Sequence, residues 1–336
     1  MIGNMKNKNN LKLIVSASPH LVSGLNTQKI MLYVVIALMP SLVASTWIFG
    51  FRAFALTVFC VAACMIFEYI FNLIAKKPQT TKDLSAVVTG ILLAFNLPVS
   101  LPYWIAAVGC FIAIIIVKQL FGGIGKNIVN PAITARVVLL VSFPAAMTTW
   151  QATRFAGDAV SGATPLGMIK EGLEVPSNMD LFLGNVGGSM GEVSALALLI
   201  GFAFLLFKKV VSPLIPICYL AVVFFFALAA GEDPLFHIFA GGVMLGALFM
   251  ATDYVTTPVL PPGQIIFGLG CGFITMVIRI WGAYPEGVSF SILLMNILVP
   301  HIDRLCDHII FKVKTVKKKS RSTKKTVMNN IKEGTK

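Results

Sequence analysis

The chain is a succession of apolar segments that are each almost long enough to cross a lipid bilayer. A spanning helix needs about 20 consecutive apolar residues, because the hydrocarbon layer is about 30 Å thick and a helix rises about 1.5 Å per residue. The third and the eighth segments are short or interrupted. The approximate bounds of the ten segments are 30–50, 54–75, 84–97, 103–121, 127–143, 193–208, 213–230, 235–252, 263–282 and 288–306. Irregular backbone cannot face lipid, so the sequence predicts an all-α membrane protein with about ten transmembrane helices.

The composition excludes an ordinary soluble domain. Of the 336 residues 57% are apolar and only 12% are charged, and the mean hydropathy is +0.85. The net charge of +13 comes partly from the tail 312–336, which holds ten Lys or Arg. In a chain with this many spans we expect that tail to meet anionic lipid headgroups, or to dock a partner, and we expect no nucleic-acid partner.

Lysine and arginine predict the orientation of the segments. With both termini in the cytoplasm, the basic tail and the basic connections all lie inside, as the positive-inside rule requires. The lysines in these connections are Lys76, Lys77, Lys82, Lys118, Lys126, Lys208 and Lys209. Five crossings then place the long loop 145–192 on the extracytoplasmic side.

The two halves of the chain match each other at an offset of 160 residues. The coinciding pairs are Pro98 with Pro258, Pro102 with Pro262, Phe121 with Trp281, and Gly122 with Gly282. Each half holds an odd number of crossings, so the sequence predicts two inverted five-helix repeats. The predicted divisions are a cytoplasmic segment 1–29, a first repeat 30–144, the outer loop 145–192, a second repeat 193–308 and a basic cytoplasmic tail 309–336.

Interrupted helices near the midplane are the expected ligand positions in such a repeat, because their free backbone groups need partners. The candidates are 95–98 and 252–258, where proline breaks both copies. The alternative is that both are ordinary loops between spans.

The outer loop contains a polar motif, Asp-Ala-Val-Ser-Gly-Ala-Thr-Pro-Leu at 158–166. It resembles the Asp-x-x-Ser/Thr-Gly-Ala-Thr sequence at which bacterial flavin transferases attach FMN through a phosphoester to the last threonine. The resemblance makes Thr164 Oγ the attachment point, and we expect an exposed loop hydroxyl, which Pro165 holds in extended backbone. The motif residues before it are Asp158, Ser161, Gly162 and Ala163. The alternative is an ordinary polar turn.

A second motif, Gly-Gly-Ile-Gly-Lys-Asn-Ile-Val-Asn-Pro-Ala at 122–132, completes a family resemblance. From Ser18 to about Asp307 the chain resembles the D subunit of the Rnf complex, the ion-translocating ferredoxin:NAD+ oxidoreductase. The same family includes the B subunit of the sodium-translocating NADH:quinone reductase. The resemblance implies a subunit that passes electrons through covalent FMN on Thr164 and a non-covalent riboflavin nearer the cytoplasm, within a complex that moves Na+ or H+. It implies no independent catalysis.

The resemblance also implies a place and a set of partners. We expect a bacterial inner membrane, other Rnf subunits that include a second covalent-FMN subunit and iron-sulfur subunits, a flavin transferase for maturation, and surrounding lipid. The alternatives are the corresponding quinone-reductase subunit, a structural anchor for other subunits and, in a different class, an inverted-repeat solute channel or transporter. A transporter gives no reason for a flavin-acceptor motif.

Asn127 and Asn130 match an Asn-x-x-Asn pair that contacts riboflavin in the related subunit. Amides three residues apart at a helix start would share one face and could each donate to and accept from a flavin edge. The alternative is that Asn127 caps the helix that Pro131 begins, while Asn130 bonds a neighbouring backbone.

Ionisable residues inside spans are the remaining candidates, because a charge near the bilayer centre must be paired or wet. The resemblance makes Glu68, Asp253 and Asp303 candidate ion-pathway acids. Alternatively, such acids and the arginines Arg136 and Arg279 neutralise one another or pair across subunits. The cysteines and histidines show no metal-ligand spacing, so we expect no metal site.

Overall fold

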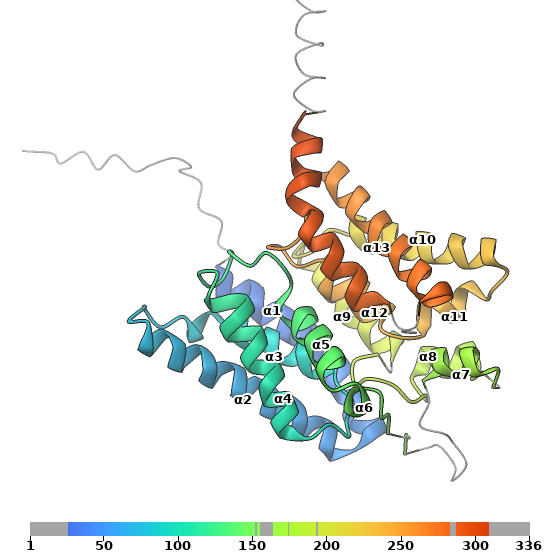
Figure 1. Ribbon diagram of the computed structural model, residues 1–336, viewed down its shortest axis with the longest axis horizontal. Helices are drawn as coiled ribbons and strands as arrows, with labels where there is room; N and C mark the ends of the chain where they lie inside the picture. Colours follow the sequence, from blue (N-terminus) through green and yellow to red (C-terminus); the bar gives the residue numbers. More distant parts are fainter. Residues whose placement is uncertain are drawn as a thin grey trace, which may run out of the picture.

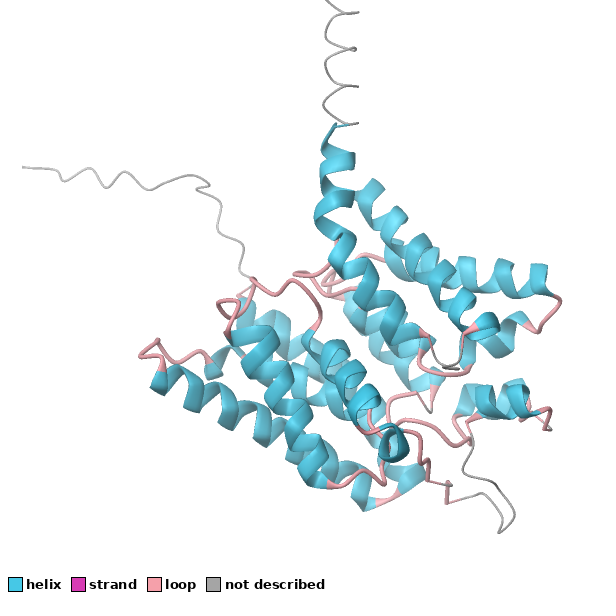
Figure 2. Ribbon diagram, in the orientation of Figure 1, coloured by secondary structure: helices cyan, strands magenta, loops and turns pink. Residues whose placement is uncertain are grey.

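The fold is helical. The computed structural model describes residues 26–151, 153–154, 164–173, 175–192, 194–282 and 287–308. Within these residues every regular element is a helix and none is a strand (Figure 2). The predicted all-α class is confirmed.

In the first half each predicted segment corresponds to a helix. The elements are α1 (Thr27–Phe49), α2 (Phe51–Ile74), the short 3₁₀ turn η1 (Thr81–Asp83), α3 (Ser85–Phe95), α4 (Tyr103–Phe111) with its π-helical continuation η2 (Ile112–Gln119), and α5 (Pro131–Ser142). Three short helices follow, namely α6 (Pro144–Met147), α7 (Pro165–Glu171) and α8 (Asn178–Leu183).

The second half repeats the pattern with one additional break. The elements are α9 (Ala195–Phe207), α10 (Leu214–Ala230), α11 (Pro234–Phe239), α12 (Val243–Leu245) with its π-helical continuation η3 (Gly246–Met250), α13 (Pro261–Trp281) and a last helix, Val288–His308. As predicted, the third segment is short and the eighth is interrupted.

Helix length separates two kinds of element. Among the described helices α1, α2, α13 and Val288–His308 are long and apolar enough to cross a membrane alone. The eleven residues of α3 rise only about 16 Å, roughly half of the hydrocarbon layer. The end of α3 therefore lies inside the protein, where its last carbonyl groups need partners other than water.

The two halves lie side by side, with α1–α5 in blue to green and α9 onward in yellow to red (Figure 1). The first helix of each half, α1 or α9, packs against the other. Their crossing is close, since a Cβ on Gly201 would lie 2.0 Å from the carbonyl oxygen of Ala37. Small residues at such crossings let membrane helices approach closely.

Side-chain contacts repeat at the offset of 160 residues. Arg136 Nη1 donates to Asn96 Oδ1 at 2.8 Å in the first half. In the second half the amide of Asn296 donates to the carbonyl of Thr256 at 3.0 Å. Position 136 corresponds to 296 and position 96 to 256, so both halves join their fifth helix to the break that follows their third span. The contacts agree with the predicted repeat.

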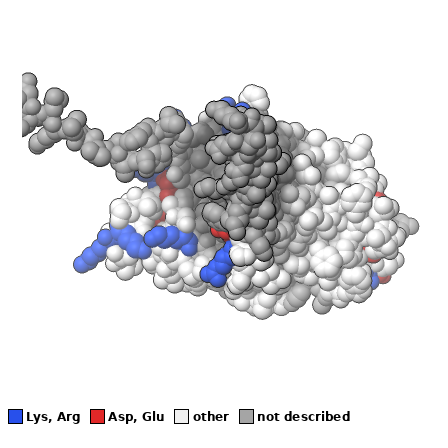
Figure 3. Space-filling view, turned by 90° about the horizontal axis from the view of Figure 1, so that it is seen from above, with Lys and Arg blue, Asp and Glu red and all other residues white. Residues whose placement is uncertain are grey.

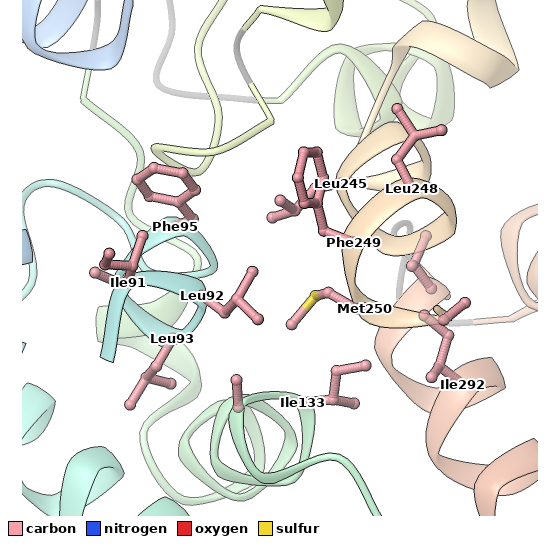
Figure 4. Packing of buried hydrophobic residues seen from close by; sticks show 14 of the residues in the cluster. Ile91, Leu92, Leu93, Phe95, Ile133, Leu245, Leu248, Phe249, Met250 and Ile292 are labelled. Carbon is pink, nitrogen blue, oxygen red and sulfur yellow. The ribbon is translucent and has the colours of Figure 1, made fainter. Parts of the chain in front are cut away.

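The two short helices meet at the centre of the molecule (Figure 4). Side chains from the end of α3 face side chains of α12 and η3, while Ile133 of α5 and Ile292 of the last helix complete the cluster. The residues from the short helices are Ile91, Leu92, Leu93, Phe95, Leu245, Leu248, Phe249 and Met250. The hydrophobic core is thus centred on the ends of incomplete helices.

Basic side chains mark one face. α1 begins and the last helix ends toward the same side of the molecule (Figure 1). Figure 3 views that side and shows Lys and Arg gathered on one part of it, while most of the surface is uncharged. Lys208 Nζ lies 5.6 Å from the centroid of the Tyr33 ring, which places the end of α9 beside the start of α1. The predicted topology requires this arrangement, and its assignment to the cytoplasm stays a prediction.

Candidate cofactor sites

The end of α3 is sealed by a part of the outer loop that turns inward. The backbone N–H of Gly191 donates to the Phe95 carbonyl at 2.8 Å, and that of Met190 donates to the Leu97 carbonyl at 3.4 Å. A Cβ on Gly191 would lie 2.5 Å from Phe95 Cβ, so glycine is needed for this approach. The segment 95–98 is therefore a buried helix end, as the interrupted-helix prediction requires.

A buried ion pair holds the same inward turn. Arg136 Nη1 lies 3.2 Å from Glu192 Oε1 as well as 2.8 Å from Asn96 Oδ1, and all three residues are buried. The sequence placed Glu192 in the outer loop, and the structure corrects its surroundings. It lies in the protein interior because the turn 189–192 occupies the space beyond the end of α3, which a longer helix would fill. Its partner Arg136 is neutralised within the chain.

The additional break in the second half falls at 240–242, between α11 and α12. Gly241 and Gly242 have φ of +60° and +66°, which L side chains rarely adopt. Arg279 donates to the carbonyls of His237, Ala240 and Gly241 at 2.6, 2.7 and 2.8 Å. The sequence predicted an interruption of the eighth segment but placed it at 252–258, although the Ala-Gly-Gly run could have indicated 240–242.

A cavity of about 100 Å³ lies toward the basic face, between the two halves. Asn127, Asn130 and Asp253 all line it, together with side chains of α1, α3 and η3. The other polar residues around it are Ser85, Thr89, Lys118, Thr252 and Tyr254. The structure thus brings the predicted Asn pair and the interrupted segment 252–258 to one place, which we call the inner cavity.

The two asparagines differ in their contacts. Asn130 is the N-cap of α5, and its Oδ1 accepts from the backbone N–H of Ala132 and Ile133 at 3.0 and 3.3 Å. Its Nδ2 donates to the Met250 carbonyl at 3.4 Å. Asn127 Oδ1 is buried and has no partner among the described residues.

The alternative in which Asn127 caps the helix is therefore wrong, since the cap belongs to Asn130. The argument that both amides share a helix face is also wrong, because α5 begins at Pro131 and both residues precede it. Both side chains reach the inner cavity because both residues belong to the loop that precedes α5.

The three candidate acids have different surroundings. Glu68 is fully buried and ion-paired with Lys118 Nζ at 2.9 Å. It also accepts from Thr80 Oγ1 at 2.6 Å and from Gln119 Nε2 at 3.0 Å. Its neutralising partner is thus a lysine at the end of η2, where the alternative had named arginines.

Asp253 and Asp303 are both half-buried, and both lie toward the basic face. Asp253 lines the inner cavity and accepts from Thr256 Oγ1 at 3.2 Å. The Oδ1 atom of Asp303 is buried and has no hydrogen-bond partner among the described residues. The contacts of Glu68, Asp253 and Asp303 are separate, so the three acids do not form one cluster. Among the described residues no group of three His, Cys, Asp or Glu side chains is placed to hold a metal ion.

Thr164 lies on the opposite side, at the start of α7. Its backbone is extended, with φ −71° and ψ 156°, and its Oγ1 accepts from the Gly167 N–H at 3.2 Å. Asp158, Ser161, Gly162 and Ala163 lie outside the described residues.

The expected exposed hydroxyl is wrong, because Thr164 is only 7% exposed. It lines a hollow of about 10 Å³ together with Glu192 and Gly241. This burial comes from the packing of α7 against α11, which a motif of nine residues does not encode.

Comparison with known proteins places the whole chain in one group. The model of the NQR2, RnfD, RnfE family matches residues 14–312. The D subunit of the Na(+)-translocating ferredoxin:NAD(+) oxidoreductase complex of Acetobacterium woodii is 49% identical over 318 residues, which cover 94% of this chain and 100% of that protein. The D subunit of the proton-translocating complex of Clostridium ljungdahlii is 42% identical, covering 88% and 95%. The D subunit of the ion-translocating oxidoreductase complex of Stutzerimonas stutzeri is 40% identical, covering 84% and 91%.

Proposed function

The chain belongs to the NQR2, RnfD, RnfE family, and from this premise we propose that it is the flavin-carrying membrane subunit of an ion-translocating ferredoxin:NAD+ oxidoreductase complex. One flavin is FMN, attached to Thr164, and the other is riboflavin, held in the inner cavity. The isoalloxazine supplies the electron chemistry when bound, and the chain supplies position, burial and hydrogen bonds. The partners are the other subunits of the complex, including a second covalent-FMN subunit and iron-sulfur subunits.

The observation that carries the inner site is the unpartnered Oδ1 of Asn127. A buried acceptor without a donor costs about 1–3 kcal/mol, so a native protein places one where a ligand or water completes it. A flavin ring presents N–H and C=O groups along one edge, and an amide can accept from the first and donate to the second. Asn127 therefore fits as the direct ligand.

Asn130 has a different role in this proposal. Its Oδ1 is already used by two backbone N–H groups, so it positions the loop and leaves at most its Nδ2 for a ligand. The cavity of about 100 Å³ is smaller than a flavin ring, so binding requires side chains at its open side to move. The segment with Asp253 and Tyr254 forms part of that lining.

The outer site rests on the motif and on the chemistry of Thr164. The Thr164 hydroxyl is the nucleophilic group of the motif. Thr164 has the extended backbone that a residue before proline prefers. The ring of an attached FMN cannot occupy a hollow of about 10 Å³, so it lies outside that hollow.

Ion coupling is assigned to the acids on the basic face. Glu68 is saturated by three donors, so a cation reaches it only when Lys118 withdraws. Asp253 and Asp303 have fewer donors and need no such displacement. We assign them as the first carboxylates to test, with Na+ or H+ as the ion.

The test of the cofactor assignment measures both flavins in the purified complex. Intact mass and fluorescence on a denaturing gel should show one FMN phosphoester on the wild-type chain and none on Thr164→Ala. Acid-extractable riboflavin should fall in Asn127→Leu while the covalent band is unchanged. Asn185→Leu, on the outer side, is the matched control. A fluorescent alanine variant would overturn the attachment site, and stoichiometric riboflavin in Asn127→Leu would overturn the inner site.

The corresponding quinone-reductase subunit is the second candidate, because the same family model covers it. The purified complex distinguishes the two by its electron partner. Flavin reduced by ferredoxin and reoxidised by NAD+ supports the first candidate, whereas reduction by NADH and reoxidation by a quinone supports the second.

A further inference from the structure

Thr164, the residue that the proposed function modifies, is the N-cap of α7, and α8 follows on the same segment of the chain. We call the described residues from 164 to 183 the cover. Thr164 opens the cover, is 7% exposed, and uses its Oγ1 to accept from the Gly167 N–H. A hydroxyl in this state cannot reach a phosphorus atom inside the active site of another enzyme.

The cover packs as a separate small unit. Leu166 and Leu181 of the cover form a hydrophobic cluster with Phe236 and Ala240 of the α11 segment, apart from the main core. Leu166 fills the space over Gly241, where a Cβ would lie 2.2 Å from Leu166 Cδ1. Small units outside the main core open at lower free energy than the global fold.

Two polar contacts fix the edges of the cover. Asn178 Nδ2 donates to Asp233 Oδ2 at 2.6 Å, and this bond is the main reason that the pKa of Asp233 lies below its ordinary value. Lys170 Nζ donates to the Gly282 carbonyl at 2.5 Å. Between the cover and α11 lies an open groove of about 390 Å³, lined by Asn178, Asp233, Phe236 and His237 among others. The cover thus contacts α11 beside a groove that is open to solvent.

We propose that the cover must release from α11 before Thr164 accepts flavin, and that it closes again afterwards. This inference rests on the proposed function, because it concerns the same threonine. Release exposes the hydroxyl, whose contact with the Gly167 N–H lies within the cover itself, and closure packs Leu166 back over Gly241.

The transfer itself breaks a phosphoanhydride bond and forms a phosphate ester bond. Thr164 Oγ attacks the phosphorus on the riboflavin side of a flavin dinucleotide, and the pyrophosphate P–O bond to the nucleotide breaks. The nucleoside monophosphate leaves with the bridging oxygen, and the hydroxyl proton passes to a base of the transferase. No electrons are transferred, so no oxidant or reductant is needed.

The experiment locks the cover in the full-length chain in detergent. Asn178→Cys and Asp233→Cys are bridged with a reducible bifunctional methanethiosulfonate, and flavin transferase is added with flavin adenine dinucleotide. The gel fluorescence should develop at least about tenfold more slowly in the bridged chain and recover when reductant cleaves the bridge. A bridged chain labelled as fast as its reduced form would overturn the proposal.

Two controls separate other causes. Ser100→Cys with Thr149→Cys forms a matched bridge elsewhere on the outer side, where Ser100 Oγ donates to the Thr149 carbonyl at 2.7 Å, and it should leave the rate unchanged. The wild-type chain treated with the same reagent accounts for the native cysteines. If Thr164 is not the acceptor, Thr164→Ala becomes as fluorescent as the wild-type chain or no form becomes fluorescent, which is failure of the proposed function and not of the cover.

Weakening the cover should have the opposite effect. Asn178→Ala and Lys170→Ala each remove one edge contact, so flavin attachment should be roughly three to ten times faster if opening precedes transfer. Unchanged rates in both variants would contradict the proposal.

Discussion

The third span of each half is broken inside the protein. An arginine binds at each break, but the two arginines bind different groups. Arg136 binds a side-chain amide and a carboxylate, Asn96 and Glu192. Arg279 binds three backbone carbonyls at the end of α11. The first arrangement is an ion pair with a loop that enters from outside, whereas the second is a helix C-cap made by a side chain. Two helix ends inside the protein are therefore satisfied with different chemistry, at positions that the offset of 160 residues does not relate.

The largest effect is expected from Arg136→Leu. It leaves the Glu192 carboxylate buried without its cation, which costs about 3–5 kcal/mol in comparable ion pairs. Thermal unfolding of the detergent-solubilised chain measures the loss. Adding Glu192→Leu should restore much of the stability, since the uncompensated charge is gone. If the double variant is no more stable than Arg136→Leu, the unpaired Glu192 carboxylate is not the cause of the loss.

Arg279→Leu should destabilise the chain by about 2–4 kcal/mol, because it removes three hydrogen bonds from carbonyls that lie away from water. Since these three acceptors belong to the backbone, Glu192→Leu added to Arg279→Leu should give no recovery. Recovery in the same unfolding assay would show that the two arginines act alike.

Gly242→Ala should cost more than Gly231→Ala, although both glycines have positive φ. A Cβ on Gly231 meets nothing within 4 Å, so that variant reports backbone strain alone, about 1–2 kcal/mol. A Cβ on Gly242 would lie 2.6 Å from Glu192 Oε1, so the variant also disturbs the Arg136 ion pair. Equal losses of unfolding free energy in Gly242→Ala and Gly231→Ala would show that Gly242 does not affect that ion pair.

The smallest effect on stability is expected at the inner cavity. Asn127→Leu removes an acceptor that has no partner among the described residues, so its unfolding free energy should change by less than about 1 kcal/mol. Asn130→Leu removes the α5 cap and should cost about 1–2 kcal/mol. The flavin-free chain is the sample for this comparison, and equal losses would mean that Asn127 has a structural role that the contacts do not show.

Several features followed from local patterns. Apolar length predicted the ten apolar segments, although not the short helices α6, α7 and α8, and Pro98 and Pro258 indicated the interruptions that follow the third and eighth segments. The family resemblance was confirmed by the match over residues 14–312. These predictions succeeded because length, proline and motif order are properties of consecutive residues.

The remaining features depended on residues distant in the chain. Asn130 caps α5 and Asn127 does not, since Pro131 fixes where the helix begins, and the burial of Thr164 depends on Leu166 packing over Gly241. The Glu68 partner is Lys118, 50 residues away, and the Arg136 partner is Glu192, 56 residues away.

The sequence by itself determined that the chain is a helical membrane protein of two matching halves, because apolar runs must be buried in lipid as helices whose backbone groups are satisfied internally. Only the tertiary structure decided which side chains complete the two unfinished helices, which asparagine caps α5, and that the threonine of the outer motif is covered. The physical reason is that a buried carbonyl or charge must find a partner wherever packing brings one, and this choice is made in space between helices that no local pattern relates.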